Sequence, residues 1–243
     1  MKLTEEQIAA FRRDGFLLLR GFTEASRVAA IRTAALEQIA ERMPPVETEG
    51  EYAGADNPTL RRLRQVYGRD PRFRAWMTDP AIRPALAQLL GETPVLTLAH
   101  HNSIMTKMPG RSTETCWHQD RRYWHFENDN LLSVWLALGE ETAENGVLEF
   151  IPGSHRLDFA PERFDAKTCF RPDLDENAQL IATKTRFDLY AGDVVLFHCR
   201  TLHHADANRS QEPKIAFVYT VRGMENHALS GTRSDAYPEI VLT

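Results

Sequence analysis

The sequence has few cysteines, and their arrangement does not predict a structural role for them. Cys116, Cys169 and Cys199 are far apart and odd in number. None of them lies in a CxxC pair, so the pattern predicts neither a disulfide framework nor a zinc ribbon. We therefore expect free cysteines in a reducing compartment.

Long apolar runs and clusters of basic residues are missing as well. No segment approaches the ~18 consecutive apolar residues that a membrane-spanning helix needs, and the polar start MKLTEEQIAAFRRDG is unlike a secretory signal. The net charge of -5 and the lack of any Lys/Arg run argue against binding to nucleic acid. We expect a cytoplasmic protein with a small-molecule substrate and neither a nucleic-acid nor a membrane partner, as a monomer or homodimer.

The chain is long enough for one large domain, and 42% hydrophobic residues supply its core. We expect a single domain over residues 1–243, with a helical N-terminal part over about 1–93. Apolar residues at helical spacing, with capping residues before them and turn residues after them, predict helices in this part. The expected elements are helices at 3–15 capped by Thr4, 23–43 capped by Thr23 and 79–91 capped by Asp79, with a short strand at 16–22.

From about residue 94 the residue pattern changes to short runs rich in Val, Leu, Phe and Thr, which are separated by turn residues. Such runs predict a closed sandwich or jelly roll over about 94–225. The fold class is therefore α+β with a mainly β core, and the N-terminal helices pack on its sheet. A polar segment at 156–184 interrupts this series of strand-like runs and predicts a long insertion. The expected strands lie at 95–108, 132–138, 147–151, 186–190, 193–197 and 215–221.

The stretch CWHQDRRYW places His118 and Asp120 two positions apart. Alternate side chains of a strand share one face, so these two are expected to reach the same metal ion. A third ligand is expected from GDVVLFHCRTLHHADANRS, which holds His198, His203 and His204; the last two are adjacent, so only one of them can point inward. Two imidazoles and one carboxylate leave coordination positions open and suit non-haem Fe(II) that activates O2.

Four strings occur in a specific order: WHQD, VWLAL with Trp135, ENGVLEFIPGSH at 144–155, and GDVVLFHCRTLHHADAN at 192–208. Together they resemble the phytanoyl-CoA dioxygenase family of Fe(II)/2-oxoglutarate oxygenases over roughly residues 5–225. The resemblance implies a double-stranded β-helix, Fe(II) bound by an HxD pair and a distal histidine, and 2-oxoglutarate as cosubstrate. Matching the last string to the family pattern identifies His203 as the distal ligand, beside His118 and Asp120.

The resemblance also implies where 2-oxoglutarate binds. The family holds the cosubstrate through a basic residue eleven positions after the distal histidine, and this count reaches Lys214 where arginine is usual. Lysine keeps the positive charge but lacks the planar fork of arginine. Arg209 and Arg222 are the alternative anchors, and Trp135 is expected beside the cosubstrate.

A local similarity to ectoine hydroxylases around HHNSIMTKMPG and WHQDRRYWH implies further roles. Asn102 matches a glutamine that contacts 2-oxoglutarate, and Trp124 matches a tryptophan that faces the substrate. Arg121, with Arg122 and Arg222, offers charge to an anionic substrate if these side chains face the pocket. The flanking residues differ from those of ectoine hydroxylases, so the similarity does not make ectoine the substrate.

Family chemistry implies hydroxylation of an unactivated C–H bond with release of succinate and CO2. Related halogenases have alanine or glycine at the position of Asp120, so an aspartate favours hydroxylation; desaturation and ring formation start in the same way and stay open. Two other classes remain as alternatives: a cupin-type metal enzyme without 2-oxoglutarate, and a jelly roll that binds a small molecule without catalysis.

Overall fold

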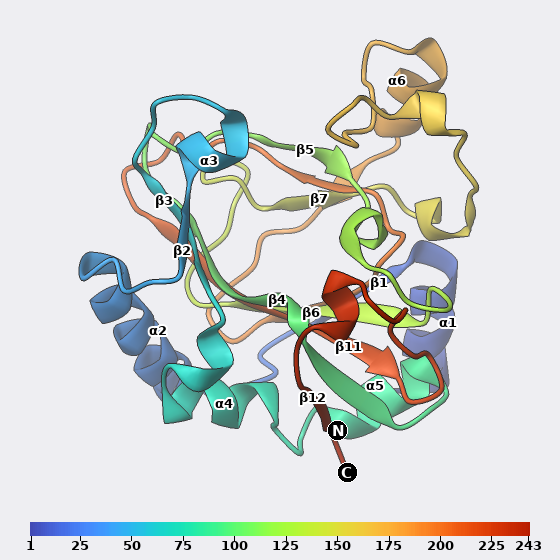
Figure 1. Ribbon diagram of the computed structural model, residues 1–243, viewed down its shortest axis with the longest axis horizontal. Helices are drawn as coiled ribbons and strands as arrows, with labels where there is room; N and C mark the ends of the chain where they lie inside the picture. Colours follow the sequence, from blue (N-terminus) through green and yellow to red (C-terminus); the bar gives the residue numbers. More distant parts are fainter.

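The computed structural model describes residues 1–243, and its strands form two antiparallel sheets that face each other (Figure 1). The larger sheet has the order β1-β9-β6-β11-β4-β3-β2, and β12 pairs with β4 beside this path. The smaller sheet has the order β5-β10-β7-β8. The strands of the larger sheet are β1 (Phe16–Leu19), β2 (Val46–Thr48), β3 (Leu60–Arg64), β4 (Pro94–Lys107), β6 (Leu131–Ala137), β9 (Val194–His198), β11 (Lys214–Gly223) and β12 (Glu239–Val241). Those of the smaller sheet are β5 (Thr115–His118), β7 (Leu148–Phe150), β8 (Thr185–Arg186) and β10 (His203–Ala205).

Four helices cover the outer face of the larger sheet, on the side away from the smaller one (Figure 1). Their apolar side chains share one buried cluster with the strands, for example Ile31, Trp76 and Leu86 with Phe217. These helices are α1 (Glu5–Asp14), α2 (Ala25–Ala40), α4 (Pro71–Met77) and α5 (Arg83–Leu90), while α3 (Glu49–Ala53) and α6 (Asp175–Ile181) lie near the smaller sheet. No helix combines the length and the apolar character needed to cross a bilayer. The arrangement confirms the predicted mainly β fold with helices packed on the sheet.

The ends of the N-terminal helices show which capping signals were correct. Thr4 caps α1 as predicted, since its hydroxyl accepts from the Gln7 amide at 3.2 Å. Thr23 does not cap α2, because the N-cap residue of this helix is Glu24, one position later. The N-cap makes no side-chain capping hydrogen bond. Asp79 is also wrong as a cap, because α5 begins only at Arg83; its carboxylate instead ion-pairs with Arg27.

The insertion predicted at 156–184 is present, and it contains a short 3-10 turn, η4 (Pro161–Arg163), and α6. Its neighbour β8 has only two residues, which is shorter than the strand predicted at 186–190. Cys169 in this insertion forms a disulfide with Cys116 in β5, so the expectation of free cysteines is wrong for these two residues. Only Cys199 stays free, and it is buried. The sequence separation of 53 between the bonded cysteines hides their proximity in the sequence.

Candidate metal centre

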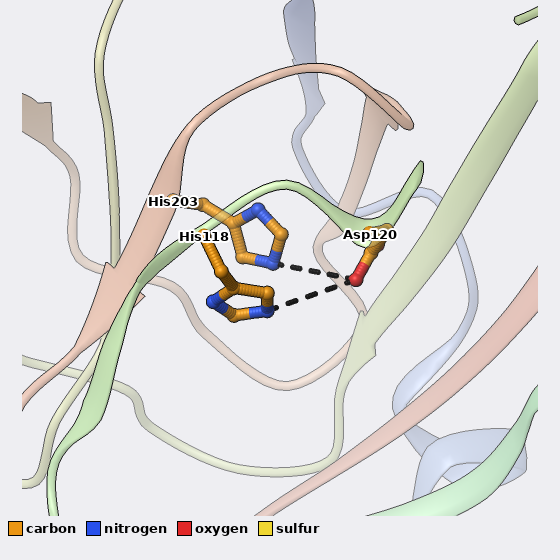
Figure 2. Close-up of side chains that lie close together, drawn as sticks. All are labelled: His118, Asp120 and His203. Atoms are coloured by element: carbon orange, nitrogen blue, oxygen red, sulfur yellow. Dashed lines mark ion pairs between the residues drawn. The ribbon is translucent and has the colours of Figure 1, made fainter. Parts of the chain in front are cut away.

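Three predicted ligands meet between the two sheets (Figure 2). His118 ends β5, His203 begins β10, and Asp120 begins the 3-10 turn η2 (Asp120–Tyr123), one residue beyond β5. The Nε2 atoms of both imidazoles lie 3.7 Å from Asp120 Oδ1, and all three side chains are buried. The strand itself ends before Asp120, so the turn rather than strand alternation brings the carboxylate to the side of the imidazoles.

Backbone pairing sets the positions of the two imidazoles. His118 and His203 stand opposite each other in the β5–β10 ladder, and their ring centroids are 4.1 Å apart. Nδ1 of His118 donates to the Cys116 carbonyl at 2.8 Å, and Nδ1 of His203 donates to the Thr201 carbonyl at 3.0 Å. A carbonyl only accepts, so the proton lies on Nδ1 and the Nε2 lone pair faces Asp120. Burial lowers the pKa of both imidazoles, which favours the neutral form that binds metals.

Asp120 is fixed from two sides. Its Oδ2 accepts from the Ser133 hydroxyl at 2.8 Å, and its Oδ1 accepts from His101 Nε2 at 2.8 Å. Burial opposes ionisation of Asp120, but the surrounding imidazoles, His101 first, lower its pKa below the ordinary value. The site therefore offers one oriented carboxylate and two neutral imidazoles, which is the donor set of a facial triad with open positions for other ligands.

His101 was not predicted, and the residue chosen from the resemblance, Asn102, lies outside the site. The Asn102 side-chain oxygen accepts from the Tyr67 amide at 2.8 Å, so the contact expected between Asn102 and 2-oxoglutarate is not supported by this geometry. The pairing of β4 explains this placement: Asn102 stands opposite Tyr219, which belongs to the buried cluster shared with the helices, so Asn102 lies on the helix side of the sheet. Alternate residues of β4, His101 and Lys107 among them, face the opposite way, so the alternation is present in the sequence but does not show which face of the strand is inward.

A cavity extends from His118 and His203, and we call it the triad cavity. Its wall includes Trp135 and Lys214, both of which had been assigned to the cosubstrate. Trp135 Nε1 donates to Glu141 Oε1 at 3.0 Å, and Lys214 Nζ lies 3.3 Å from Glu141 Oε2. A buried carboxylate that the sequence did not reveal therefore already accompanies both residues.

The remaining candidates lie outside the wall of the triad cavity. Trp124 is buried, with its ring 5.4 Å from that of His101. Arg121 ion-pairs with Asp129. The two alternative anchors are engaged as well, since Arg209 lies 3.6 Å from Asp206 and Arg222 pairs with Glu239.

Of the two adjacent histidines, only His203 joins the triad. The backbone of β10 is extended, so the neighbouring side chain points the other way. His204 stacks on Trp117, with ring centroids 5.1 Å apart, and its Nε2 lies 2.9 Å from Glu114. His204 is therefore held by contacts of its own, away from Asp120.

Proteins with similar sequences and structures support an oxygenase. The ectoine dioxygenase of Bordetella bronchiseptica is 27% identical over 241 residues, which cover 92% of this chain and 77% of that protein. The phytanoyl-CoA dioxygenase domain-containing protein 1 of Mus musculus is 25% identical over 270 residues, covering 92% and 90%. The crystal structure of EctD from S. alaskensis with 2-oxoglutarate and 5-hydroxyectoine has a TM-score of 0.78 and 25% identity, covering 93% of this chain and 78% of that one.

Fold and site together define an Fe(II)- and 2-oxoglutarate-dependent dioxygenase. The model of the phytanoyl-CoA dioxygenase family matches residues 11–216, which is most of the chain. The chain therefore belongs to the phytanoyl-CoA dioxygenase family.

Proposed function

We propose that the protein hydroxylates an unactivated C–H bond of a small molecule, consuming O2 and 2-oxoglutarate and releasing succinate and CO2. The observation that carries this proposal is the buried set of His118, Asp120 and His203, whose ligand atoms all lie within 4.8 Å of one another. These residues would hold Fe(II), which supplies the O2 chemistry when bound. An aspartate at position 120 takes up one coordination position, and this favours hydroxylation over halogenation.

The protein's own share in the reaction is to position the reactants and to exclude water. Ser133 and His101 keep the Asp120 carboxylate oriented, and the carbonyls of Cys116 and Thr201 keep both imidazoles oriented. Apolar side chains such as Phe197 and Val218 line the triad cavity together with the ligands and the cationic residues. The cosubstrate would therefore lie in the triad cavity, with its 2-oxo acid end at the ligands and its distal carboxylate at the lysines.

A second cavity supports an anionic substrate, and we call it the arginine cavity. Its wall includes Arg62, Arg64 and Arg233, together with His101, which also borders the triad cavity. Arg62 is neutralised by Glu47 at 3.0 Å, but no carboxylate lies within ion-pair distance of Arg64 or Arg233. Burial and the neighbouring Arg64 lower the pKa of Arg233, as expected for cations that lack a counter-ion. A substrate with a carboxylate or phosphate group would supply that counter-ion.

Succinate release from purified Fe(II) protein tests the function and the substrate class together. We expect turnover that requires both Fe(II) and 2-oxoglutarate and that responds to anionic compounds in a panel of amino acids, compatible solutes including ectoine, and natural-product intermediates. Each acid is paired with its amide, which keeps the shape and removes the charge. Equal turnover of acids and amides would reject the anionic class alone, whereas the absence of 2-oxoglutarate consumption with every compound would reject the oxygenase.

The adjacent histidines provide a matched pair of variants for the metal site. His203→Ala should abolish Fe(II) binding because it removes one of three ligands, whereas His204→Ala should retain it because that ring contacts Glu114 and Trp117 instead. Calorimetric titration of Fe(II) under anaerobic conditions measures both affinities. Loss of Fe(II) binding only in His204→Ala would move the ligand by one residue.

A further inference from the structure

Three cationic side chains line the triad cavity: Arg61, Lys107 and Lys214. All three are nearly inaccessible to solvent, with 5%, 6% and 3% of their surface exposed. A buried charge is costly unless an opposite charge accompanies it. The partners of these three cations therefore decide which of them is free to receive an anion.

Lys214 has its counter-ion within the protein. Its Nζ lies 3.3 Å from Oε2 of Glu141, which is completely buried, and it donates to the Gly146 carbonyl at 2.5 Å. Burial lowers the pKa of Lys214 and raises the pKa of Glu141. The pair has no net charge whether the proton lies on Nζ or on Oε2, so it offers little attraction to a second carboxylate.

Arg61 is neutralised in a similar way. Its Nη1 lies 3.0 Å from Oε2 of Glu49, another completely buried carboxylate, and its Nη2 donates to Thr115 Oγ1 at 2.8 Å. The ring of Tyr52 covers the guanidinium, with 3.5 Å between the Cζ atom and the ring centroid. Its charge and one face of its guanidinium are thus already engaged.

Lys107 differs from both, because no carboxylate lies within 4.0 Å of its ammonium. Its Nζ donates to the carbonyls of Thr113 at 2.8 Å and Ala205 at 3.2 Å, and its third N–H has no partner. Burial, followed by the charges of Lys214 and Arg61, lowers its pKa to about 7. Lys107 stands directly opposite Lys214 in the β4–β11 ladder, so the free charge lies at the same end of the triad cavity.

We infer that Lys107 is the residue that binds the distal carboxylate of 2-oxoglutarate. This inference rests on the proposed function, and it replaces Lys214 as the anchor implied by the family resemblance. Counting eleven positions from His203 leads to Lys214, which lies at the correct end of the triad cavity. However, Glu141 neutralises the charge of Lys214. The carboxylate of the ligand would accept from the unpartnered N–H of Lys107 and compensate its buried charge.

The test compares Lys107→Met and Lys214→Met with the parent protein in anaerobic titrations of the Fe(II)-loaded protein. Charge-transfer absorption and calorimetry report binding independently of turnover. For Lys107→Met we expect a loss of affinity for 2-oxoglutarate of about ten- to a hundredfold, the usual contribution of a hydrogen bond to a charged group. Affinity for 2-oxopentanoate, which has the same chain length but no distal carboxylate, should stay the same.

The outcomes separate this inference from the proposed function. A parent protein that binds no 2-oxoglutarate would reject the function. A parent that binds it, with unchanged affinity in Lys107→Met or with the loss confined to Lys214→Met, would overturn the assignment of Lys107. Thermal melts check that the variants are folded, and Lys107→Gln, which keeps a polar end without the charge, replaces Lys107→Met if that variant is unfolded.

Discussion

Replacement of Asp120 by alanine should lower the rate of succinate release by on the order of a thousandfold, because the several kcal/mol that a bound metal contributes to catalysis would be lost. Asp120 supplies the only carboxylate among the three candidate ligands. Its removal leaves two neutral imidazoles, which neither balance the charge of Fe(II) nor complete the triad. The measurements are iron content per chain after dialysis and succinate release at saturating 2-oxoglutarate.

Two further variants separate coordination from orientation. Asp120→Asn keeps the size of the side chain and its contacts with Ser133 but loses the negative charge, so we expect nearly the same loss. Ser133→Ala keeps the carboxylate and removes only its bond to Oδ2, so we expect a smaller loss, about 10–100-fold. Full activity of a folded Asp120→Ala protein would contradict the assignment of this residue as a ligand.

Elements with strong local signals were predictable from the sequence. The Thr4 hydroxyl and the glycine at position 15, which adopts the left-handed conformation, define both ends of α1. The run at 95–108, which is rich in Val, Leu and Thr and ends at Pro109 and Gly110, corresponds to β4, which runs from Pro94 to Lys107. In both cases the information lies within one element, so no tertiary contact is needed to interpret it.

Residues 46–77 show the opposite situation, because neither β2, β3, α3 nor α4 was predicted. The sequence of β3, LRRLR, is dominated by charge and does not look like a buried strand. It forms one because Leu60 and Leu63 enter the core while Arg61 and Arg62 ion-pair with Glu49 and Glu47. Such compensation depends on residues that lie outside the strand, and local propensity does not include them.

The candidate site was also predictable only in part, because the sequence identifies the metal ligands but not the residues that contact them. The HxD spacing and the order of the family strings identify His118, Asp120 and His203, which the structure brings together. Alternation along β4 separates His101 from Asn102, but only the pairing with β11 shows that His101 is on the inward face, beside Asp120. The partner of Lys214 is equally hidden, because Glu141 lies 73 positions away in the chain, as the two residue numbers show.

The pairing of Lys214 with Glu141 predicts a large effect on stability. Lys214→Met would leave the Glu141 carboxylate buried without its partner, and breaking a buried pair in this way costs about 3–5 kcal/mol of the free energy of unfolding. At roughly 2–4 °C per kcal/mol for a chain of this size, the melting temperature should fall by on the order of 10 °C. Calorimetric melting of the apoprotein measures this shift.

Two controls and one pH series test the cause of that loss. Glu141→Gln added to Lys214→Met should restore most of the stability, because it removes the stranded charge. Lys107→Met strands no carboxylate and should not lower the melting temperature.

Burial raises the pKa of Glu141, and a raised pKa in the folded state contributes stability that is present at low pH and is lost as pH rises. The deficit of Lys214→Met should therefore shrink as pH falls toward the range where Glu141 is protonated. A deficit that stays constant with pH, or that persists when Glu141→Gln is added, would show that Lys214 stabilises the fold by some other contact.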